Sequence, residues 1–317
     1  MSVQIAVIDD WQNVASGVVD WSALESLGQV HFLHDYPADT AVMIERLQAF
    51  DVICVMRERS IFDKALLQGL PNLKLLVTGG MRNAALDIPA AKALGISVCG
   101  TDSYKQAAPE LTWALIMAST RNLLAEANSL RAGGWQVGLG GDLYGKTLGI
   151  LGLGSIGQKV AQFAQVFGMR VIAWSENLTP ERAAESGVTW VSKKELFEQA
   201  DILTVHLVLS DRSRGLVDAE ALGWMKPSAR LVNTARGPIV DEQALVQALE
   251  SGRLAGAALD VFAEEPLPDD HPFRRLPTVL ATPHVGYVSE QNYRQFYAQM
   301  IEDIQAWANG APIRVLA

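Results

Sequence analysis

Cysteine is nearly absent from this chain of 317 residues, which holds only Cys54 and Cys99. Both lie in apolar, strand-like runs, so we expect two buried thiols rather than a disulfide, and a reducing cytoplasm as the compartment. Residues 1–10 fit a strand and have neither the basic region nor the cleavage site of a secretory signal. This pattern also favours the cytoplasm.

Basic charge, long apolar runs and clustered histidines are lacking as well. The formal net charge is −9, which argues against nucleic-acid binding through a basic surface. No apolar run approaches the roughly 20 residues that span a bilayer, so we expect no membrane partner. The five histidines are scattered, without the spacing of metal ligands, and we expect no metal.

Short apolar runs that alternate with helical patterns predict α/β architecture with parallel sheets. The chain is too long for one core, and 49% of its residues are hydrophobic, which indicates two domains. A long helix is expected at 108–130 and an amphipathic one at 291–309. We expect strands at 5–8, 30–33, 52–56, 73–78 and 97–99, and then at 148–151, 170–174, 202–206, 231–234, 256–260 and 279–281.

Glycines spaced G-x-G-x-x-G end the predicted strand at 148–151 and open a helical pattern. In that context Gly152 allows a tight turn, Gly154 lets the backbone approach a pyrophosphate, and Gly157 lets helix and strand pack closely. The phosphates would lie at the helix N-terminus. With the polar residues at neighbouring strand ends, the candidate cofactor-binding residues are Gly152, Gly154, Ser155, Ile156, Gly157, Ser175, Glu176, His206, Thr234 and Ala235.

Three further residues at strand ends suit the reduction of a 2-keto acid by hydride transfer. Arg236 offers a planar, charged fork for the substrate carboxylate. His284 can supply the proton that the carbonyl oxygen gains, and Glu265 can orient the ring and favour its charged form. Each alone also fits a structural role. Arg236 could form a surface ion pair, His284 could be a hydrogen-bonded structural histidine, and Glu265 could belong to a turn. Their combination beside a nucleotide fingerprint favours the catalytic interpretation.

These segments closely resemble the D-isomer-specific 2-hydroxyacid dehydrogenase family. The stretch 145–154 is similar to the cofactor signature of that family, 225–237 to its arginine signature, and 258–268 and 282–286 to its glutamate and histidine signatures. The resemblance implies that Arg236 binds the carboxylate, Glu265 is the partner of the histidine, and His284 is the general acid/base. It also implies that Asp260 holds the nicotinamide carboxamide.

The same resemblance implies an enzyme with two Rossmann-like domains. A Rossmann NAD(P)-binding domain, residues 107–287, would be inserted into a discontinuous flavodoxin-like substrate domain, residues 1–106 plus 288–317. The implied activity is stereospecific, NAD(P)-dependent hydride transfer between a nicotinamide and a small 2-keto or 2-hydroxy acid. A homodimer built on the long helix is implied as well.

The substrate loop departs from the pattern of many relatives. The chain has Met81-Arg82-Asn83 there, with Arg82 in place of a glycine, and Tyr287 follows the histidine motif where glycine is common. Substrate preference therefore cannot be transferred from better-known members, and the side-chain positions of Arg82, Tyr287 and Trp135 are left open. Besides Arg236 and His284, the candidate substrate-binding residues are Arg57, Gly79, Gly80 and Met81; the amides of the two glycines are expected to add to carboxylate binding.

The cofactor subtype also has two interpretations. Ser175 stands where NAD-using relatives usually have Asp, which removes the repulsion of a 2′-phosphate. Glu176 restores a negative charge, and no Arg follows at once, so NAD is slightly favoured over NADP. Two other functions stay open: a corepressor-like protein that senses NAD(H) without turnover, and a dehydrogenase of a small anion such as formate or phosphite.

Overall fold

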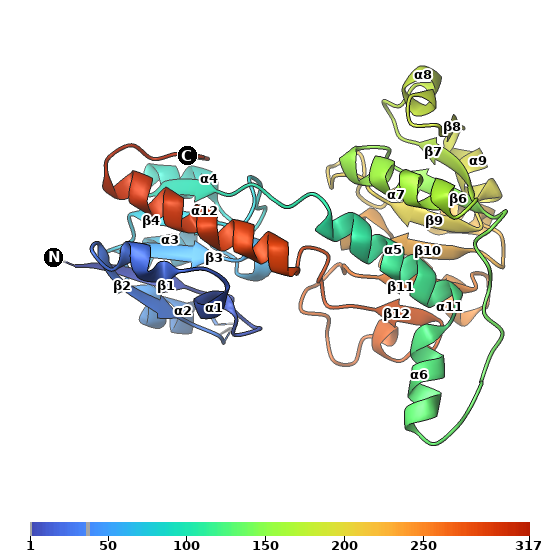
Figure 1. The fold of residues 1–317 in the computed structure, drawn as a ribbon, viewed down its shortest axis with the longest axis horizontal. Helices are drawn as coiled ribbons and strands as arrows, with labels where there is room; N and C mark the ends of the chain where they lie inside the picture. The colour runs from blue at the N-terminus through green and yellow to red at the C-terminus, as the bar shows by residue number, and fades with distance from the viewer. Residues whose placement is uncertain (1, 36–38) are drawn as a thin grey trace. The chain divides into compact units, whose positions relative to one another are not determined.

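The computed structural model describes residues 2–35 and 39–317. The chain divides into two compact units, Met1–Tyr104 with Val288–Ala317, and Lys105–Tyr287. Each unit contains its own parallel sheet with helices packed on it (Figure 1). The predicted α/β class with two parallel-sheet domains is confirmed.

The first unit contains a five-stranded sheet in the order β2-β1-β3-β4-β5, the flavodoxin-like order. In the register of β3 and β4, Val55 pairs with Thr78, so these two strands end side by side. The residues that follow them, including Arg57 and Gly79, therefore emerge at one edge of the sheet. The strands are β1 Val3–Val7, β2 Gly28–Phe32, β3 Val52–Val55, β4 Leu75–Thr78 and β5 Ser97–Gly100.

Helices cover both faces of this sheet, and α12 comes from the C-terminal end of the chain. Phe296, Met300 and Ile304 on α12 are buried, which agrees with the amphipathic helix predicted at 291–309. The last residues then pair with β5, where the Leu316 amide donates to the Val98 carbonyl at 2.7 Å. The helices are α1 Ala15–Val18, η1 Trp21–Leu24, α2 Thr40–Leu47, η2 Arg57–Arg59, α3 Lys64–Gln68, α4 Ile88–Ala93 and α12 Glu290–Ala308.

The second unit contains a seven-stranded sheet in the order β12-β11-β10-β9-β6-β7-β8. This is the Rossmann order, with the first strand β6 at the point where the strand order reverses. Six strands were predicted; the seventh, β8, has only two residues, both exposed, so no apolar pattern marks it. The strands are β6 Thr147–Leu151, β7 Arg170–Trp174, β8 Thr189–Trp190, β9 Ile202–Val205, β10 Arg230–Asn233, β11 Gly256–Leu259 and β12 Val279–Ala281.

The long helix predicted at 108–130 is wrong, because the chain forms two helices there. Asn122 takes a left-handed conformation, with φ of 52°, and ends one helix before the next begins. Asn tolerates that conformation better than most residues, so no Gly or Pro is needed at the break. The helices of the unit are α5 Ala107–Thr120, α6 Leu123–Arg131, α7 Ser155–Val166, α8 Pro180–Ala184, α9 Lys193–Gln199, α10 Ala219–Trp224, η3 Gly237–Ile239, α11 Glu242–Glu250 and η4 Pro272–Arg274.

The two cysteines are free and buried, as predicted, on β3 and β5 of the first unit. Burial raises the pKa of the Cys99 thiol to about 11, so this thiol stays protonated and unreactive at neutral pH. Among the described residues, no helix is long and apolar enough to cross a membrane.

Candidate active site

Glycine occurs at three positions of the turn after β6, and the structural reason for it differs from one position to the next. Gly152 has φ of 103°, and a Cβ there would lie 2.9 Å from the carbonyl of His206. A Cβ on Gly157 would lie 2.3 Å from the Gly152 oxygen, so only glycine lets helix and turn approach this closely. A Cβ on Gly154, in contrast, would meet no protein atom within 4 Å. The space in front of Gly154 is therefore open to a ligand.

The first turn of α7 follows this open space. Gly154 precedes the 12-residue helix and offers no side chain to cap it, so the first amides, those of Ser155 and Ile156, find no cap there. Free amides at a helix N-terminus, together with the helix dipole, bind phosphate. The residues present thus fit the pyrophosphate of a dinucleotide.

The polar residues at the neighbouring strand ends lie at the same edge of the sheet. Ser175 is half-buried and its carbonyl accepts the Leu178 amide at 3.0 Å, while Glu176 is exposed. The next cation along the chain is Arg182, on α8. His206 donates or accepts at Thr204 over 3.0 Å, and burial lowers its pKa to about 3, so its ring is neutral.

The turn that carries Arg236 is fixed from two sides. The Asn233 side chain donates to the Arg236 carbonyl and accepts from the Ala235 amide, both at 3.0 Å. A Cβ on Gly237 would lie 2.0 Å from the Phe262 carbonyl, so this turn packs directly on the backbone that leads to Glu265. Thr234 next to it shares a 2.7 Å hydrogen bond with Thr112 of α5. The turn that carries Arg236 is therefore packed tightly against the segment that leads to Glu265.

Glu265 and His284 form a close pair. Nδ1 of His284 lies 2.5 Å from Oε2 of Glu265, and the side chains are 21% and 33% exposed. The other carboxylate oxygen accepts the Phe262 amide at 2.9 Å. The Tyr287 ring packs edge-on against the imidazole, with 5.5 Å between ring centroids. The carboxylate fixes the tautomer of the ring and leaves Nε2 as the nitrogen that can exchange a proton with a substrate.

Asp260 is fully buried beside this pair, and it ties the histidine turn to the end of β11. It accepts hydrogen bonds from the Thr282 hydroxyl at 2.6 Å and from the Val285 and Gly286 amides at 2.8 Å. Burial raises the pKa of this carboxyl, and the three donors oppose that shift. Because its oxygens already serve three internal donors, we infer that positioning the segment around His284 is a main part of its role.

In the first unit, the candidate substrate residues lie where β3 and β4 end. Arg57 has a left-handed backbone, with φ of 57°, and its Nη1 would lie 2.3 Å from a Cβ on Gly80. The amides of Gly79 and Gly80 already donate, to the Val55 carbonyl at 3.1 Å and to the Thr101 hydroxyl at 2.8 Å. The two amides that were expected to bind the substrate carboxylate therefore already have acceptors within the unit. Met81 is the next residue. Its side chain is 40% exposed.

Asn83 organises this loop, a role that the sequence did not predict. Its side-chain amide donates to the Arg57 carbonyl at 2.6 Å and to the Thr78 hydroxyl at 2.9 Å, and its oxygen accepts the Ala85 amide. It is 6% exposed, whereas Arg82 beside it is exposed. In the second unit, Trp135 is 73% exposed on the segment after α6.

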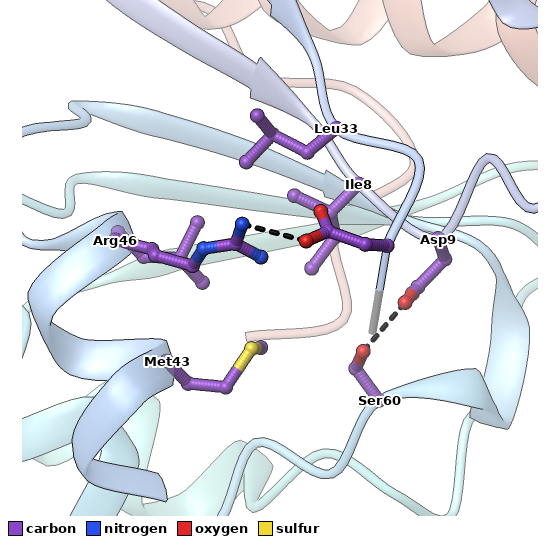
Figure 2. A pocket seen from close by; sticks show the side chains of 8 residues that line it. Ile8, Asp9, Leu33, Met43, Arg46 and Ser60 are labelled. Atoms are coloured by element: carbon purple, nitrogen blue, oxygen red, sulfur yellow. Dashed lines mark hydrogen bonds and ion pairs between the residues drawn. The ribbon is translucent and has the colours of Figure 1, made fainter. Parts of the chain in front are cut away.

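A small pocket in the first unit involves none of the predicted site residues. Figure 2 shows it between α2 and the ends of the first strands, with Asp9 and Ser60 facing each other. The Ser60 hydroxyl donates to Asp9 at 2.5 Å, and Arg46 pairs with Asp35 at 2.6 Å. Burial raises the pKa of Asp9 to about 6. Since the charged groups lining it have partners, we assign no ligand to it.

Comparison with known proteins decides the family. Residues 113–286 match the family model described as D-isomer specific 2-hydroxyacid dehydrogenase, NAD binding domain. The chain belongs to this family. Its second unit is thus the NAD-binding domain of a 2-hydroxyacid dehydrogenase family member, and the predicted family and cofactor class, NAD or NADP, are confirmed.

Curated members of the family resemble the chain along most of its length. It is 38% identical over 258 residues to the glyoxylate reductase of Aeropyrum pernix. This alignment covers 78% of this chain and 77% of that protein. The chain is 36% identical over 293 residues to the D-3-phosphoglycerate dehydrogenase of Bacillus subtilis, which covers 92% of this chain. The chain spans only 55% of the length of the Bacillus protein.

A solved structure of the family superimposes over nearly the whole chain. The phosphoglycerate oxidoreductase of Vibrio cholerae matches with a TM-score of 0.94 and 38% sequence identity, over 98% of this chain and 100% of that one. The names of these relatives describe oxidoreductases, the enzyme class predicted from the sequence, but they differ in substrate.

Proposed function

We propose that this protein is an NAD(P)-dependent reductase of small 2-keto acids that forms D-2-hydroxy acids. The observation that carries the proposal is the 2.5 Å pair of His284 and Glu265 within an NAD-binding domain of this family. A hydride that adds to a carbonyl carbon requires a proton for the carbonyl oxygen, and an imidazole held by a carboxylate supplies one.

The residues of the second unit divide the remaining work. Nδ1 of His284 is engaged by Glu265, so Nε2 is the nitrogen that gives its proton to the carbonyl oxygen, and the carboxylate holds the ring in the orientation for this transfer. Arg236 orients the substrate carboxylate through its guanidinium. A nicotinamide dinucleotide, with its pyrophosphate at Gly154, Ser155 and Ile156, supplies the hydride when bound. In the first unit, we propose Arg57 and Met81 as further contacts to the substrate.

We propose NAD as the preferred cofactor. Glu176 places a carboxylate just beyond β7, where it disfavours a 2′-phosphate, and residues 175–181 contain no cation to pair with one. Ser175 removes one negative charge from this position, so we expect a moderate preference.

We propose a homodimer as the assembled state. The helix α6 has no buried residue, and it projects from the sheet of its own unit in Figure 1. Residues 132–146 follow it. Isolated domains rarely expose so many large apolar side chains together, and a second copy would cover them. These side chains are those of Leu123, Leu124, Leu130, Trp135, Val137, Leu139 and Tyr144.

We propose the cytoplasm as the compartment, because two free, buried thiols fit a reducing environment.

The experiment follows the oxidation of NADH and of NADPH with glyoxylate, hydroxypyruvate, pyruvate and bulkier 2-keto acids, with chiral analysis of the product. We expect turnover with at least one small keto acid, a D product and a higher kcat/KM with NADH. Cofactor binding without turnover of any keto acid would favour an NAD(H)-sensing protein instead. NAD reduction by formate or phosphite alone would favour the oxidation of a small anion.

A further inference from the structure

A second histidine–glutamate pair lies in the same unit as the first. Nε2 of His271 is 3.0 Å from Oε1 of Glu242, with side chains 17% and 23% exposed. Glu242 is the first residue of α11, and His271 directly precedes η4. Neither residue belongs to the proposed proton-transfer machinery, and neither carries a role so far.

The hydrogen bonds around this pair fix where its proton lies. The Phe273 amide donates to Nδ1 of His271 at 3.2 Å, so Nδ1 must be unprotonated. The ring proton is therefore on Nε2, and it is donated to Glu242. The Phe273 ring also packs against the imidazole, with centroids 4.8 Å apart. His271 is thus a fixed donor that is aimed at one oxygen of Glu242.

The other oxygen of Glu242 connects this pair to the proposed catalytic pair. Oε2 accepts the amide of Ala263 at 3.1 Å. The preceding amide, that of Phe262, donates to Oε1 of Glu265 at 2.9 Å. Two consecutive backbone amides therefore each hold one carboxylate, and each carboxylate holds one histidine. A rotation of the backbone at 262–263 would disturb both pairs at once.

We propose that Glu242 and His271 are positioning residues for the Glu265–His284 pair: they anchor the Ala263 amide and so aim the Phe262 amide and the Glu265 carboxylate at His284. This role rests on the proposed function of that pair. On its other side the same backbone is confined by Gly237, which packs against the Phe262 carbonyl. Held from both sides, Glu265 is oriented before substrate arrives, which is what efficient proton transfer requires.

Glu242→Gln is the most direct test. The two oxygens of Glu242 accept from two donors, the Ala263 amide and Nε2 of His271, and a glutamine side chain has only one oxygen for both. If its oxygen keeps the Ala263 amide, its NH2 group opposes the Nε2 proton of His271; if it turns, the Ala263 amide loses its acceptor. His271→Phe keeps the ring shape but removes the donor, whereas His271→Gln restores a donor near the Nε2 position. Gln243→Ala, the next residue on α11 and exposed, is the matched control.

Two readouts separate positioning from a merely structural role. The first is kcat with the best keto acid, which we expect to fall about tenfold in Glu242→Gln and His271→Phe, a fraction of what general acid catalysis contributes. Thermal unfolding and the Kd of NADH should change little, and Gln243→Ala and His271→Gln should stay within about twofold of wild type.

The second readout needs no turnover. A short N–H···O bond such as that from His284 to Glu265 gives a proton resonance far downfield of the amide region, which His284→Ala identifies by its loss. We expect this resonance to weaken or shift upfield in Glu242→Gln and His271→Phe, and to persist in His271→Gln and Gln243→Ala. An unchanged resonance in both disruptive variants would overturn the proposal. Absence of keto-acid turnover in wild type would instead count against the proposed function, and the resonance would still decide the positioning role.

Discussion

Substituting Gly154 and Gly157 one at a time tests where the cofactor binds. A Cβ on Gly154 meets no protein atom, and the φ of −85° there suits alanine, so Gly154→Ala should fold as well as wild type. The methyl group would nevertheless occupy the space assigned to the pyrophosphate. Gly157→Ala should behave in the opposite way, because its Cβ would lie 2.3 Å from the Gly152 oxygen.

The magnitudes follow from these contacts. Losing one charged hydrogen bond between a phosphate and a backbone amide costs about 1.5–3 kcal/mol, so the Kd of NADH should rise about tenfold to a hundredfold in Gly154→Ala. Overpacking at Gly157 should lower the free energy of unfolding by about 1–3 kcal/mol. Gly223→Ala on α10 is the matched control, since its Cβ also meets nothing within 4 Å and alanine favours a helix.

The assay is titration of each variant with NADH by calorimetry, next to urea unfolding. The reasoning predicts weak binding with normal stability for Gly154→Ala, and normal binding with normal or raised stability for Gly223→Ala. Wild-type affinity in Gly154→Ala would refute the placement of the pyrophosphate in front of this residue.

Three further predictions concern the acid pair, a buried carboxyl and the assembly. Glu265→Gln keeps an acceptor for the Phe262 amide but removes the carboxylate that holds Nδ1 of His284, so kcat should fall about tenfold or more; a kcat equal to that of wild type would contradict the pairing. Burial raises the pKa of Asp303 from 3.8 to about 7, so the folded state binds the extra proton and stability should fall as pH rises from about 4 to about 7. Asp303→Asn should flatten this fall in urea unfolding at several pH values, and an unaltered slope would exclude Asp303 as its source. Leu139→Asp, at a side chain 97% exposed on the apolar segment after α6, should shift the protein from dimer to monomer in sedimentation, whereas Ile61→Asp, 64% exposed in the other unit, should not; a Leu139→Asp dimer as stable as wild type would locate the interface elsewhere.

Much of the fold is predictable because buried strands are short apolar runs bounded by polar turns. The ends of β3 and β9 agree with the predicted strands to within a residue, and both strands are buried along their whole length. The strand β8 escaped prediction because its two residues are exposed. The break between α5 and α6 escaped because Asn122 needs no glycine to adopt a left-handed backbone.

The residue types of the site were predictable, but their connections were not. Glu265 and His284 lie 19 residues apart, and only the fold brings Nδ1 to 2.5 Å from the carboxylate. The sequence likewise gave no sign that the Gly79 and Gly80 amides are used internally, since Thr101 comes from the end of another strand. Glu242 and His271 lie 29 residues apart, and their pair connects to the Glu265–His284 pair through two backbone amides, which leave no trace in residue type.

The general-acid role of His284 is the central claim, and the most direct test is the kcat/KM of His284→Ala for the keto acid that wild type reduces best, measured with saturating NADH. The account predicts a loss of about 10²–10⁴-fold, with the Kd of NADH and the thermal unfolding temperature unchanged. A kcat/KM equal to that of wild type would contradict it.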